Sequence, residues 1–317
     1  MKSDQEASNQ ALVSIVMNCY NGDSYLHESI KSVISQTYEN WELIFWDNQS
    51  TDNSKSIFDS YKDSRLKYYY AKEHTNLGVA RAQAFKLVSG EFIAVLDTDD
   101  IWIPSKLEKQ LKLFDDLEVG LVISDTMFFN DSSERAVYSG NYPPEGYVFS
   151  ELLTGYFVSL VSLMLRKSTV ESLDYGIDAD FSFIADFDLV LRIAKISKLV
   201  VHKEVLAKWR VHEKSDSWRS PVTFCYEREL WIDKQIKQDA SFSYRYSKEI
   251  SLLHSKNFQL MAMDALSNNE RLSALRFISN TNFKDWHNYA VIFLCFIPFS
   301  NKFIQYLQNR RMRRLLG

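Results

Sequence analysis

The sequence predicts an α/β protein, in which a mostly parallel sheet flanked by helices is followed by an all-helical C-terminal region. Up to about residue 215, short apolar runs alternate with amphipathic segments, which is the pattern of βαβ units. From about Arg228 onward only helical patterns remain, which indicates a boundary near residue 225. We therefore expect one domain over residues 1–225 and a helical region over residues 226–317.

Each element of the first region is expected from its own run of residues. Short apolar runs predict strands at residues 12–17, 42–47, 66–70, 92–96, 119–124, 160–165 and 205–211. Apolar residues at helical spacing predict helices at residues 26–37, 54–61, 78–88, 107–114 and 186–196. Residues 131–155 are rich in Ser, Gly, Pro and Tyr, so we expect a long loop with an edge strand there.

Composition excludes several classes of protein. The 317 residues are 46% apolar and 25% charged, as in an ordinary folded protein, and the net charge of −4 argues against nucleic-acid binding. Three scattered cysteines offer no disulfide framework, which fits a reducing compartment. The polar start, residues 1–6, predicts no signal peptide, and the longest apolar stretch, residues 289–299, is about half a membrane span. We expect a cytoplasmic protein, at most attached to the cytoplasmic face of the inner membrane.

Three carboxylates follow the apolar run at residues 92–96, in the tetrad Asp97-Thr98-Asp99-Asp100. A strand that ends in acids places charge at the rim of a sheet, where open α/β folds bind ligands. Acids this close repel one another unless a cation or hydrogen bonds offset their charge, and Mg²⁺ or Mn²⁺ prefers such oxygen ligands. The alternative is a solvated acidic turn before the next helix.

Five segments, in order and spacing, resemble the family 2 glycosyltransferases. They are SIVMNCYN (14–21), SVISQTY (32–38), WELIFWDNQSTDN (41–53), NLGVARA (76–82) and GEFIAVLDTDD (90–100). The resemblance is strong over about residues 12–115 and looser to about residue 215. It implies the GT-A fold with a Rossmann-like sheet, inversion at the anomeric carbon, and a nucleotide-diphosphate sugar donor, favouring a UDP-sugar, held with Mn²⁺ or Mg²⁺.

The resemblance assigns nucleotide contacts to Tyr20, Asp47, Arg81 and Asp97. Asp47 would accept a hydrogen bond from a base N–H, or else only start the following turn. The ring of Tyr20 would stack on the base, or merely pack. Arg81, in the first turns of a helix, would face an anion, or form a surface salt bridge. Asp97 resembles the acid that binds the ribose.

Metal ligation is assigned by the same resemblance to Asp99, which would bridge to the donor diphosphate, while Asp100 would orient the loop. His212, in the segment WRVHEKSDS (209–217), would complete the metal shell or touch the diphosphate, or else be structural. Arg210 would add positive charge against the diphosphate. The metal would offset charge on the departing nucleoside diphosphate.

Asp186 is the expected catalytic base, since inversion requires a group that removes the proton of the acceptor hydroxyl. The family commonly has Glu-Asp here, whereas this chain has Ala185-Asp186, which puts sugar or acceptor contacts in doubt. A helix N-cap is the alternative role for Asp186. Asp188, two residues on, should point away around the helix.

Two features stand out in the C-terminal region. Residues 250–268 and 272–279 suggest an antiparallel helical pair with a core of Leu252, Leu253, Met261, Leu266 and Leu275. Aromatic and apolar residues from Trp286 to Phe299, followed by the basic cluster Arg310, Arg311, Arg313 and Arg314, suit a helix on an anionic membrane surface. A buried terminal helix with a solvated basic tail is the alternative.

The expected function is transfer of one sugar to a hydroxyl of a glycan, as a lipid-linked oligosaccharide or surface polysaccharide precursor. One rival is a non-catalytic relative that binds nucleotide sugars or glycans, supported by Ala185. The other is a sugar nucleotidyltransferase, which would need a Gly-rich basic loop after the first strand, where this chain has Asn18-Cys19-Tyr20-Asn21-Gly22.

Overall fold

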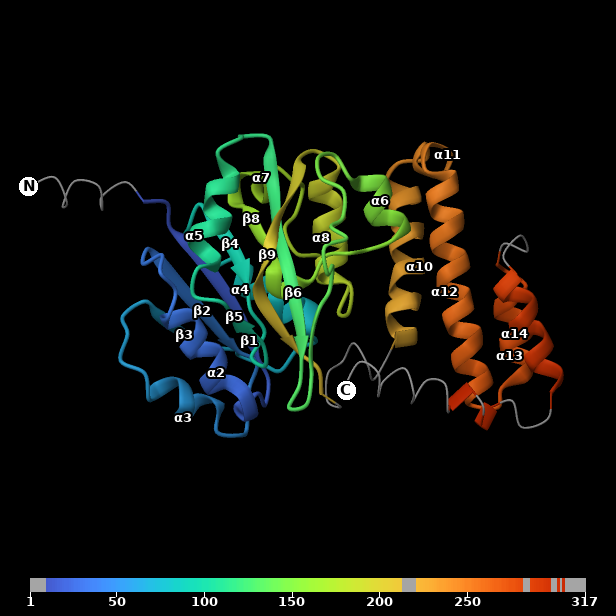
Figure 1. Ribbon diagram of the computed structural model, residues 1–317, viewed down its shortest axis with the longest axis horizontal. Coiled ribbons are helices and arrows are strands. Elements are labelled where there is room, and N and C mark those ends of the chain that lie inside the picture. Colours follow the sequence, from blue (N-terminus) through green and yellow to red (C-terminus); the bar gives the residue numbers. More distant parts are fainter. Residues whose placement is uncertain (1–9, 213–220, 282–285, 298–300, 303, 306–317) are drawn as a thin grey trace, which may run out of the picture. The chain divides into compact units, whose positions relative to one another are not determined.

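The chain divides into two units (Figure 1). The computed structural model describes residues 10–212, 221–281, 286–297, 301–302 and 304–305. One unit comprises residues 1–129, 134–149 and 157–210, and the other comprises residues 130–133, 150–156 and 211–317. A functional division at residue 225 stays a prediction.

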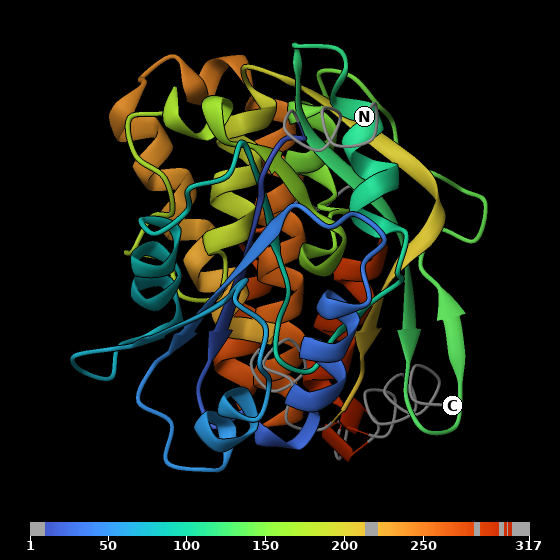
Figure 2. The ribbon, with the colours of Figure 1, turned by 90° about the vertical axis from the view of Figure 1, so that its left-hand side faces the viewer.

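A sheet of nine strands, within the described residues, forms the first unit. Its order is β3-β2-β1-β4-β8-β6-β9-β5, and β7 pairs with β6 as a hairpin (Figure 2). The strands are β1 (Val13–Cys19), β2 (Trp41–Asp47), β3 (Leu66–Tyr70), β4 (Phe92–Val95), β5 (Ile101–Trp102), β6 (Val119–Phe129), β7 (Glu134–Ala136), β8 (Met164–Arg166) and β9 (Lys198–Arg210). β3, β2, β1 and β4 run parallel, as do β6 and β9, whereas β8 and β5 are antiparallel to their neighbours.

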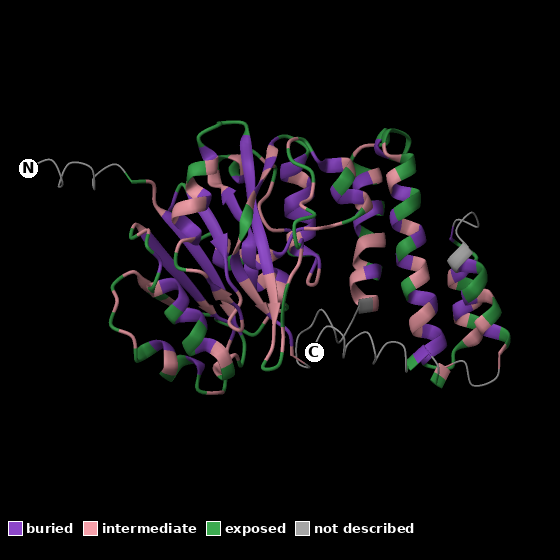
Figure 3. Ribbon diagram, in the orientation of Figure 1, coloured by how far each residue is buried: buried purple, intermediate pink, exposed green. Residues whose placement is uncertain are grey.

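Helices pack on this sheet through their apolar faces. In α2 (Asp23–Ile34), Leu26, Ile30 and Val33 recur at helical spacing and are fully buried. The other α-helices of the first unit are α3 (Ser54–Asp59), α4 (Leu77–Phe85), α5 (Lys106–Leu111), α7 (Lys167–Glu171) and α8 (Ala185–Ala194). The helix α6 (Phe149–Thr154) belongs almost entirely to the second unit. The central strands β1, β2, β4 and β6 are buried along most of their length (Figure 3), whereas β3 and β7 are not. Parallel strands with helices between them confirm the expected α/β fold.

The strand expected at residues 160–165 is only partly correct. Leu160–Ser162 is instead a 3₁₀ turn (η3), and the strand β8 starts at Met164. The carbonyls of Val161 and Ser162 accept hydrogen bonds from Trp102 Nε1 and Gln110 Nε2, both at 2.8 Å. These side-chain donors satisfy the backbone without a β ladder. The loop expected at residues 131–155 contains β7 and also α6, which is too short to give a periodic signal.

The described part of the second region is helical, as expected. It contains α10 (Pro221–Gln238), α11 (Phe242–Arg245), α12 (Ser247–Ser267), α13 (Arg271–Ile278) and α14 (Trp286–Phe296). Leu253, Met261 and Leu266 are buried as predicted, and Leu275 packs against the cluster that includes Leu266, Ala274 and Val291. Leu252 is 39% exposed, so its assignment to the core was wrong, because it lies on another face of α12.

Exposed aromatic side chains lie on one face of α14: Tyr289, Phe293 and Phe296. None of the helices in the described part of the chain is long and apolar enough to cross a membrane. The predicted basic cluster at residues 310–314 and Phe299 lie outside the described residues, and so does the side chain of Trp286.

A buried acid joins the first two strands. Glu42 of β2 lies opposite Ser14 of β1, and its Oε1 accepts hydrogen bonds from Ser14 Oγ at 2.5 Å and Ser89 Oγ at 2.6 Å. Lys67 of β3 donates to the other carboxylate oxygen. Although burial raises the pKa of Glu42, the hydrogen bonds from Lys67, Ser14 and Ser89 outweigh it and lower that pKa to about 2.

We predict that Glu42 makes folding stability depend on pH. Because its pKa is lower in the folded chain, it contributes stability above about pH 4.5 that is lost as the pH falls toward 2. The contribution is about 3 kcal/mol at neutral pH. Urea denaturation of the wild type and Glu42→Gln between pH 7 and pH 3 should give curves that converge as pH falls. A constant difference between the two would contradict this.

Candidate functional site

Three parallel strands end at one edge of the sheet, and their loops are joined by hydrogen bonds. Cys19 at the end of β1 pairs with Asp47 at the end of β2, and the Asp97 loop follows β4 on the other side of β1. Asn21 N donates to Ser50 Oγ at 3.0 Å, and Thr51 N donates to Asn21 Oδ1 at 2.8 Å. The predicted residues Tyr20, Asp47 and Asp97 therefore belong to neighbouring loops.

Asp47 is fully buried, and protein groups donate to both of its oxygens. Ser50 N donates to Oδ1 at 2.7 Å, and Tyr68 OH donates to Oδ2 at 2.6 Å. Burial and the Asp47 charge raise the pKa of Tyr68, which keeps this phenol protonated as a donor. The turn contact that was the alternative role for Asp47 is present, and its role toward a base stays a prediction.

Tyr20 is accessible at the same edge. Its side chain is 54% exposed, and its ring packs against that of His74 with centroids 4.2 Å apart. One side of the Tyr20 ring is therefore supported, as a stacking platform requires.

Arg81 lies on α4, which begins after Asn76, whose side chain accepts a hydrogen bond from Val79 N. The Arg81 side chain is buried, so its ion pair with Asp97 (Nη2 to Oδ1, 3.2 Å) is not a surface salt bridge. Its Nε is buried and has no hydrogen-bond partner in the described structure. A buried guanidinium nitrogen of this kind is suited to an anionic oxygen.

The pKa of Asp97 is subject to opposing electrostatic effects. Loss of water around its carboxylate raises the pKa of Asp97, and the Arg81 charge opposes this rise. The nearby charges of Asp99 and Asp186 raise it further. Asp97, Asp99, Asp186 and Arg81 are thus brought within electrostatic reach of one another, although Asp186 is 89 residues from Asp97 in the sequence.

Two groups behind the acidic loop hold its shape. The buried hydroxyl of Ser29 lies 2.8 Å from the carbonyl of Thr98 and 2.7 Å from that of Asp100. Arg210, at the end of β9, donates its backbone N–H to Asp100 Oδ1 (2.8 Å) and its Nε–H to the Asp99 carbonyl (2.9 Å). Its Nη2 pairs with Glu28. Arg210, expected to face a diphosphate, instead binds the main chain of the loop.

Two acids of this loop face arginines: Asp97 pairs with Arg81, and Asp100 accepts a hydrogen bond from the backbone of Arg210. Metal ligation by Asp99 stays a prediction. Within the described residues, no group of three or more His, Cys, Asp or Glu side chains is placed to hold a metal by itself. Mg²⁺-type ions commonly bind through one or two carboxylates together with substrate phosphates and water. The donor set therefore fits a metal that is completed by a diphosphate. His212 belongs to the second unit, and its role as a ligand stays a prediction.

Asp186 lies in the first turn of α8, where Ile184 occupies the N-cap position, so the N-cap alternative is wrong. Ala185 is fully buried. Asp188 is also buried and pairs with Arg192 at 2.6 Å, away from the predicted base. The residue before the base is thus part of the core and offers no surface for a substrate contact.

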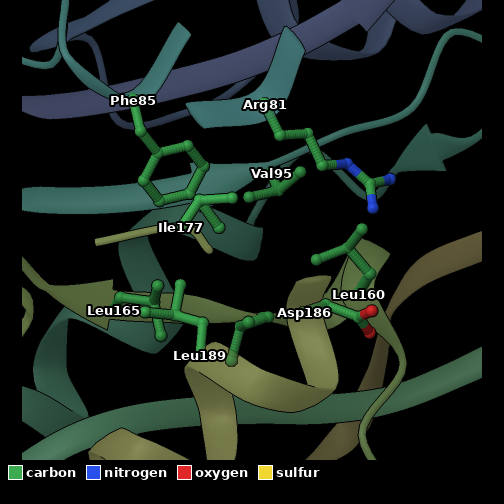
Figure 4. Close-up of a pocket in the computed structure, with 9 residues that line it drawn as sticks. Arg81, Phe85, Val95, Leu160, Leu165, Ile177, Asp186 and Leu189 are labelled. Carbon is green, nitrogen blue, oxygen red and sulfur yellow. The ribbon is translucent and has the colours of Figure 1, made fainter. Parts of the chain in front are cut away.

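A glycine brings α4 and the segment before α8 together. A Cβ on Gly78 would lie 1.9 Å from the carbonyl oxygen of Phe181, so only glycine fits this approach. Figure 4 shows the result, with Arg81 and Asp186 on facing walls of one pocket and Leu160 between them. Phe85 and Val95 lie on the wall of Arg81, and Leu189 lies on the wall of Asp186. The cavity itself is only about 10 Å³, which is room for one water molecule. The residues that line it therefore act as a packed wall beside the charged groups.

Several of these features were not predicted from the sequence. Ser29 and Gly78 gave no signal of their own, since serine and glycine are common in helices and loops. The sequence indicates Arg210 as a candidate residue, but its contact with Asp100, 110 residues away in the sequence, leaves no local signal.

Comparisons with known proteins agree with this geometry. The family model "Glycosyl transferase family 2" matches residues 14–172. The chain is 32% identical over 184 residues (58% of this chain, 70% of the relative) to the Escherichia coli UDP-Glc:alpha-D-GlcNAc-diphosphoundecaprenol beta-1,3-glucosyltransferase WfgD.

Solved structures show the same fold. Staphylococcus aureus TarS 1–349 in complex with UDP-GlcNAc matches with a TM-score of 0.66, at 16% identity, over 96% of this chain and 90% of TarS. The Pyrobaculum calidifontis mannosyltransferase PcManGT in complex with GDP-Man and Mn²⁺ matches with a TM-score of 0.59, at 16% identity, over 86% of this chain and 74% of that one. The expected GT-A fold is confirmed, and the chain belongs to glycosyl transferase family 2.

Proposed function

We propose that this transferase is metal-dependent and inverting, and moves a sugar from a UDP-sugar to a hydroxyl of a lipid-linked or polysaccharide precursor. The single observation that carries the proposal is the convergence of Asp97, Arg81 and Asp186 on one site: Arg81 forms an ion pair with Asp97, and Arg81 and Asp186 line one pocket. Two acids and a buried arginine are the groups that a diphosphate leaving group and an attacking hydroxyl require.

The donor occupies the edge formed by the ends of β1, β2 and β4. Tyr20 stacks on the base, Asp47 accepts its N–H, and Asp97 binds the ribose. The buried Nε of Arg81 supports a contact with a phosphate oxygen. UDP is favoured because the relative WfgD is named for UDP-Glc and TarS was solved with UDP-GlcNAc.

Asp99 would hold Mn²⁺ or Mg²⁺ together with the donor diphosphate, and His212 is a candidate further ligand. When bound, the metal supplies Lewis-acid stabilisation of the leaving group. The Mn²⁺ in the PcManGT complex supports this choice. Arg210 and Ser29 hold the backbone of the loop, so the Asp99 carboxylate is already positioned before the donor arrives.

Asp186 accepts the proton of the acceptor hydroxyl. The missing acid at position 185 does not argue against catalysis, because Ala185 is fully buried and a side chain there faces the core. A non-catalytic role is therefore not favoured.

The acceptor and the location follow from the relatives and from α14. WfgD is named for a lipid-linked acceptor, and the exposed Tyr289, Phe293 and Phe296 share one helical face. An aromatic face of this kind supports attachment to a membrane surface. The chain would then act at the cytoplasmic face of the inner membrane.

We predict that Asp186→Asn lowers transfer at least about 100-fold, since general-base catalysis is worth 10²–10⁴. Affinity for UDP with Mn²⁺ should stay unchanged, because Asp186 contacts the acceptor and not the nucleotide.

Asp99→Ala should lower both transfer and metal-dependent binding of UDP. Transfer assays and calorimetry distinguish the two, and exposed Glu171→Gln serves as a matched control. Full turnover by Asp186→Asn would exclude it as the base.

We predict that Arg210→Lys weakens metal-dependent binding of UDP about tenfold while leaving metal-free binding unchanged. Lysine keeps the charge but loses the fork that reaches both the Asp99 carbonyl and Glu28. Glu28→Gln, which spares the loop contact, should have a smaller effect. Calorimetric titration with UDP, with and without Mn²⁺, measures each. An equal loss of affinity in both conditions would indicate general destabilisation and would contradict a positioning role.

A further inference from the structure

An open groove of about 510 Å³ lies within the helical second unit, and none of the residues that line it has a role in the sugar transfer proposed above. One wall is a single face of α12, formed by Ser247, Ser251, His254 and Phe258, which recur at i, i+4, i+7 and i+11. At 1.5 Å per residue this face is about 16 Å long. Glu229 of α10 and Asn280 after α13 lie across from it. The volume is in the range of ligand sites.

A carboxylate–imidazole pair fixes the polar part of the groove. Glu229 Oε2 lies 2.5 Å from His254 Nδ1, and Glu229 Oε1 accepts a hydrogen bond from Asn257 Nδ2 at 2.7 Å. Both carboxylate oxygens are therefore oriented before any ligand binds. The half-buried His254 keeps its other ring nitrogen, Nε2, for a further polar contact.

A row of rings forms the apolar part. His254 and Phe258, which both line the groove, lie with ring centroids 6.2 Å apart and ring planes at 24°. Phe277, which is not one of the lining residues, packs against Phe258 with centroids 6.4 Å apart and ring planes at 28°. Next to these rings, Ser247 and Ser251 present exposed hydroxyl groups. Short donors and acceptors thus lie toward one end of this face of α12, and apolar ring faces lie toward the other.

The lining also excludes charged ligands. Among the described residues, neither lysine nor arginine lines the groove, so it offers no countercharge to a phosphate or a nucleotide. Its one acid, Glu229, is paired with His254. A ligand that matches must be neutral, rich in hydroxyl groups, and able to place C–H faces on aromatic rings.

We propose that this groove binds a short neutral saccharide, as a glycan site separate from the transfer centre. A pyranose ring carries hydroxyls for Ser247, Ser251, Asn280 and His254, and a C–H face for Phe258. The identification of this saccharide as part of the acceptor rests on the proposed function, whereas saccharide binding itself does not.

The test uses the full chain and three neutral trisaccharides: laminaritriose, chitotriose and maltotriose. Saturation-transfer NMR at about 10 mM sugar detects dissociation constants in the millimolar range. At least one should bind, and Ser251→Trp, which fills the groove, should weaken binding at least tenfold. Leu252→Trp, at the exposed neighbouring position on another face of α12, should not. Circular dichroism checks that both variants fold, and Ser247→Trp repeats the block.

Absence of binding by all three sugars would overturn the proposal, as would equal binding by wild type and both groove variants. Tighter binding of trigalacturonate than of every neutral sugar would also overturn it. Asp99→Ala separates the two proposals, because it should lose donor chemistry and keep saccharide binding. Ser251→Trp should keep metal-dependent hydrolysis of the donor. Loss of both activities in Ser251→Trp would show that the groove is not a separate site.

Discussion

The mutual repulsion of three carboxylates within one loop is the constraint on which this site depends. Asp97, Asp99 and Asp100 follow a buried strand within four residues. The first is offset by the Arg81 guanidinium, and the third by the backbone N–H of Arg210. Asp100 is almost fully buried; burial and the neighbouring acids raise its pKa, and the contact with Arg210 opposes this. The contacts with Arg81 and Arg210 thus offset two of the three acids within the protein itself.

Backbone contacts bring segments that are distant in the sequence to this acidic loop. α4 supplies Arg81, and Gly78 on that helix allows the backbone of Phe181 to approach. That approach carries the start of α8, and with it Asp186, to the wall of the same pocket. β9 supplies Arg210 from the other side of the loop. The acidic loop, the proposed base Asp186 and Arg81 therefore depend on one another through backbone contacts as much as through charge.

Much of the fold followed from local pattern. The strand expected at residues 66–70 matches β3, and β1 and β2 lie within two residues of their expected bounds, because each is a short apolar run between turn residues. The strand prediction was wrong at residues 160–162, because the side chains of Trp102 and Gln110 donate hydrogen bonds to carbonyls of this segment. A local sequence pattern contains no information about such distant donors. The positions of Asp97 and Asp99 at a sheet edge were predictable, whereas the Arg210 and Gly78 contacts depend on residues about 100 positions apart.

The central claim is that Asp186 activates a hydroxyl for direct attack opposite the leaving group. The stereochemistry of transfer tests this most directly. With an α-linked UDP-sugar as donor, the anomeric proton of the first product is followed by NMR as it forms. The account predicts a β-linked product from the earliest time point. An α-linked product would contradict inversion, and with it the assignment of Asp186 as the base.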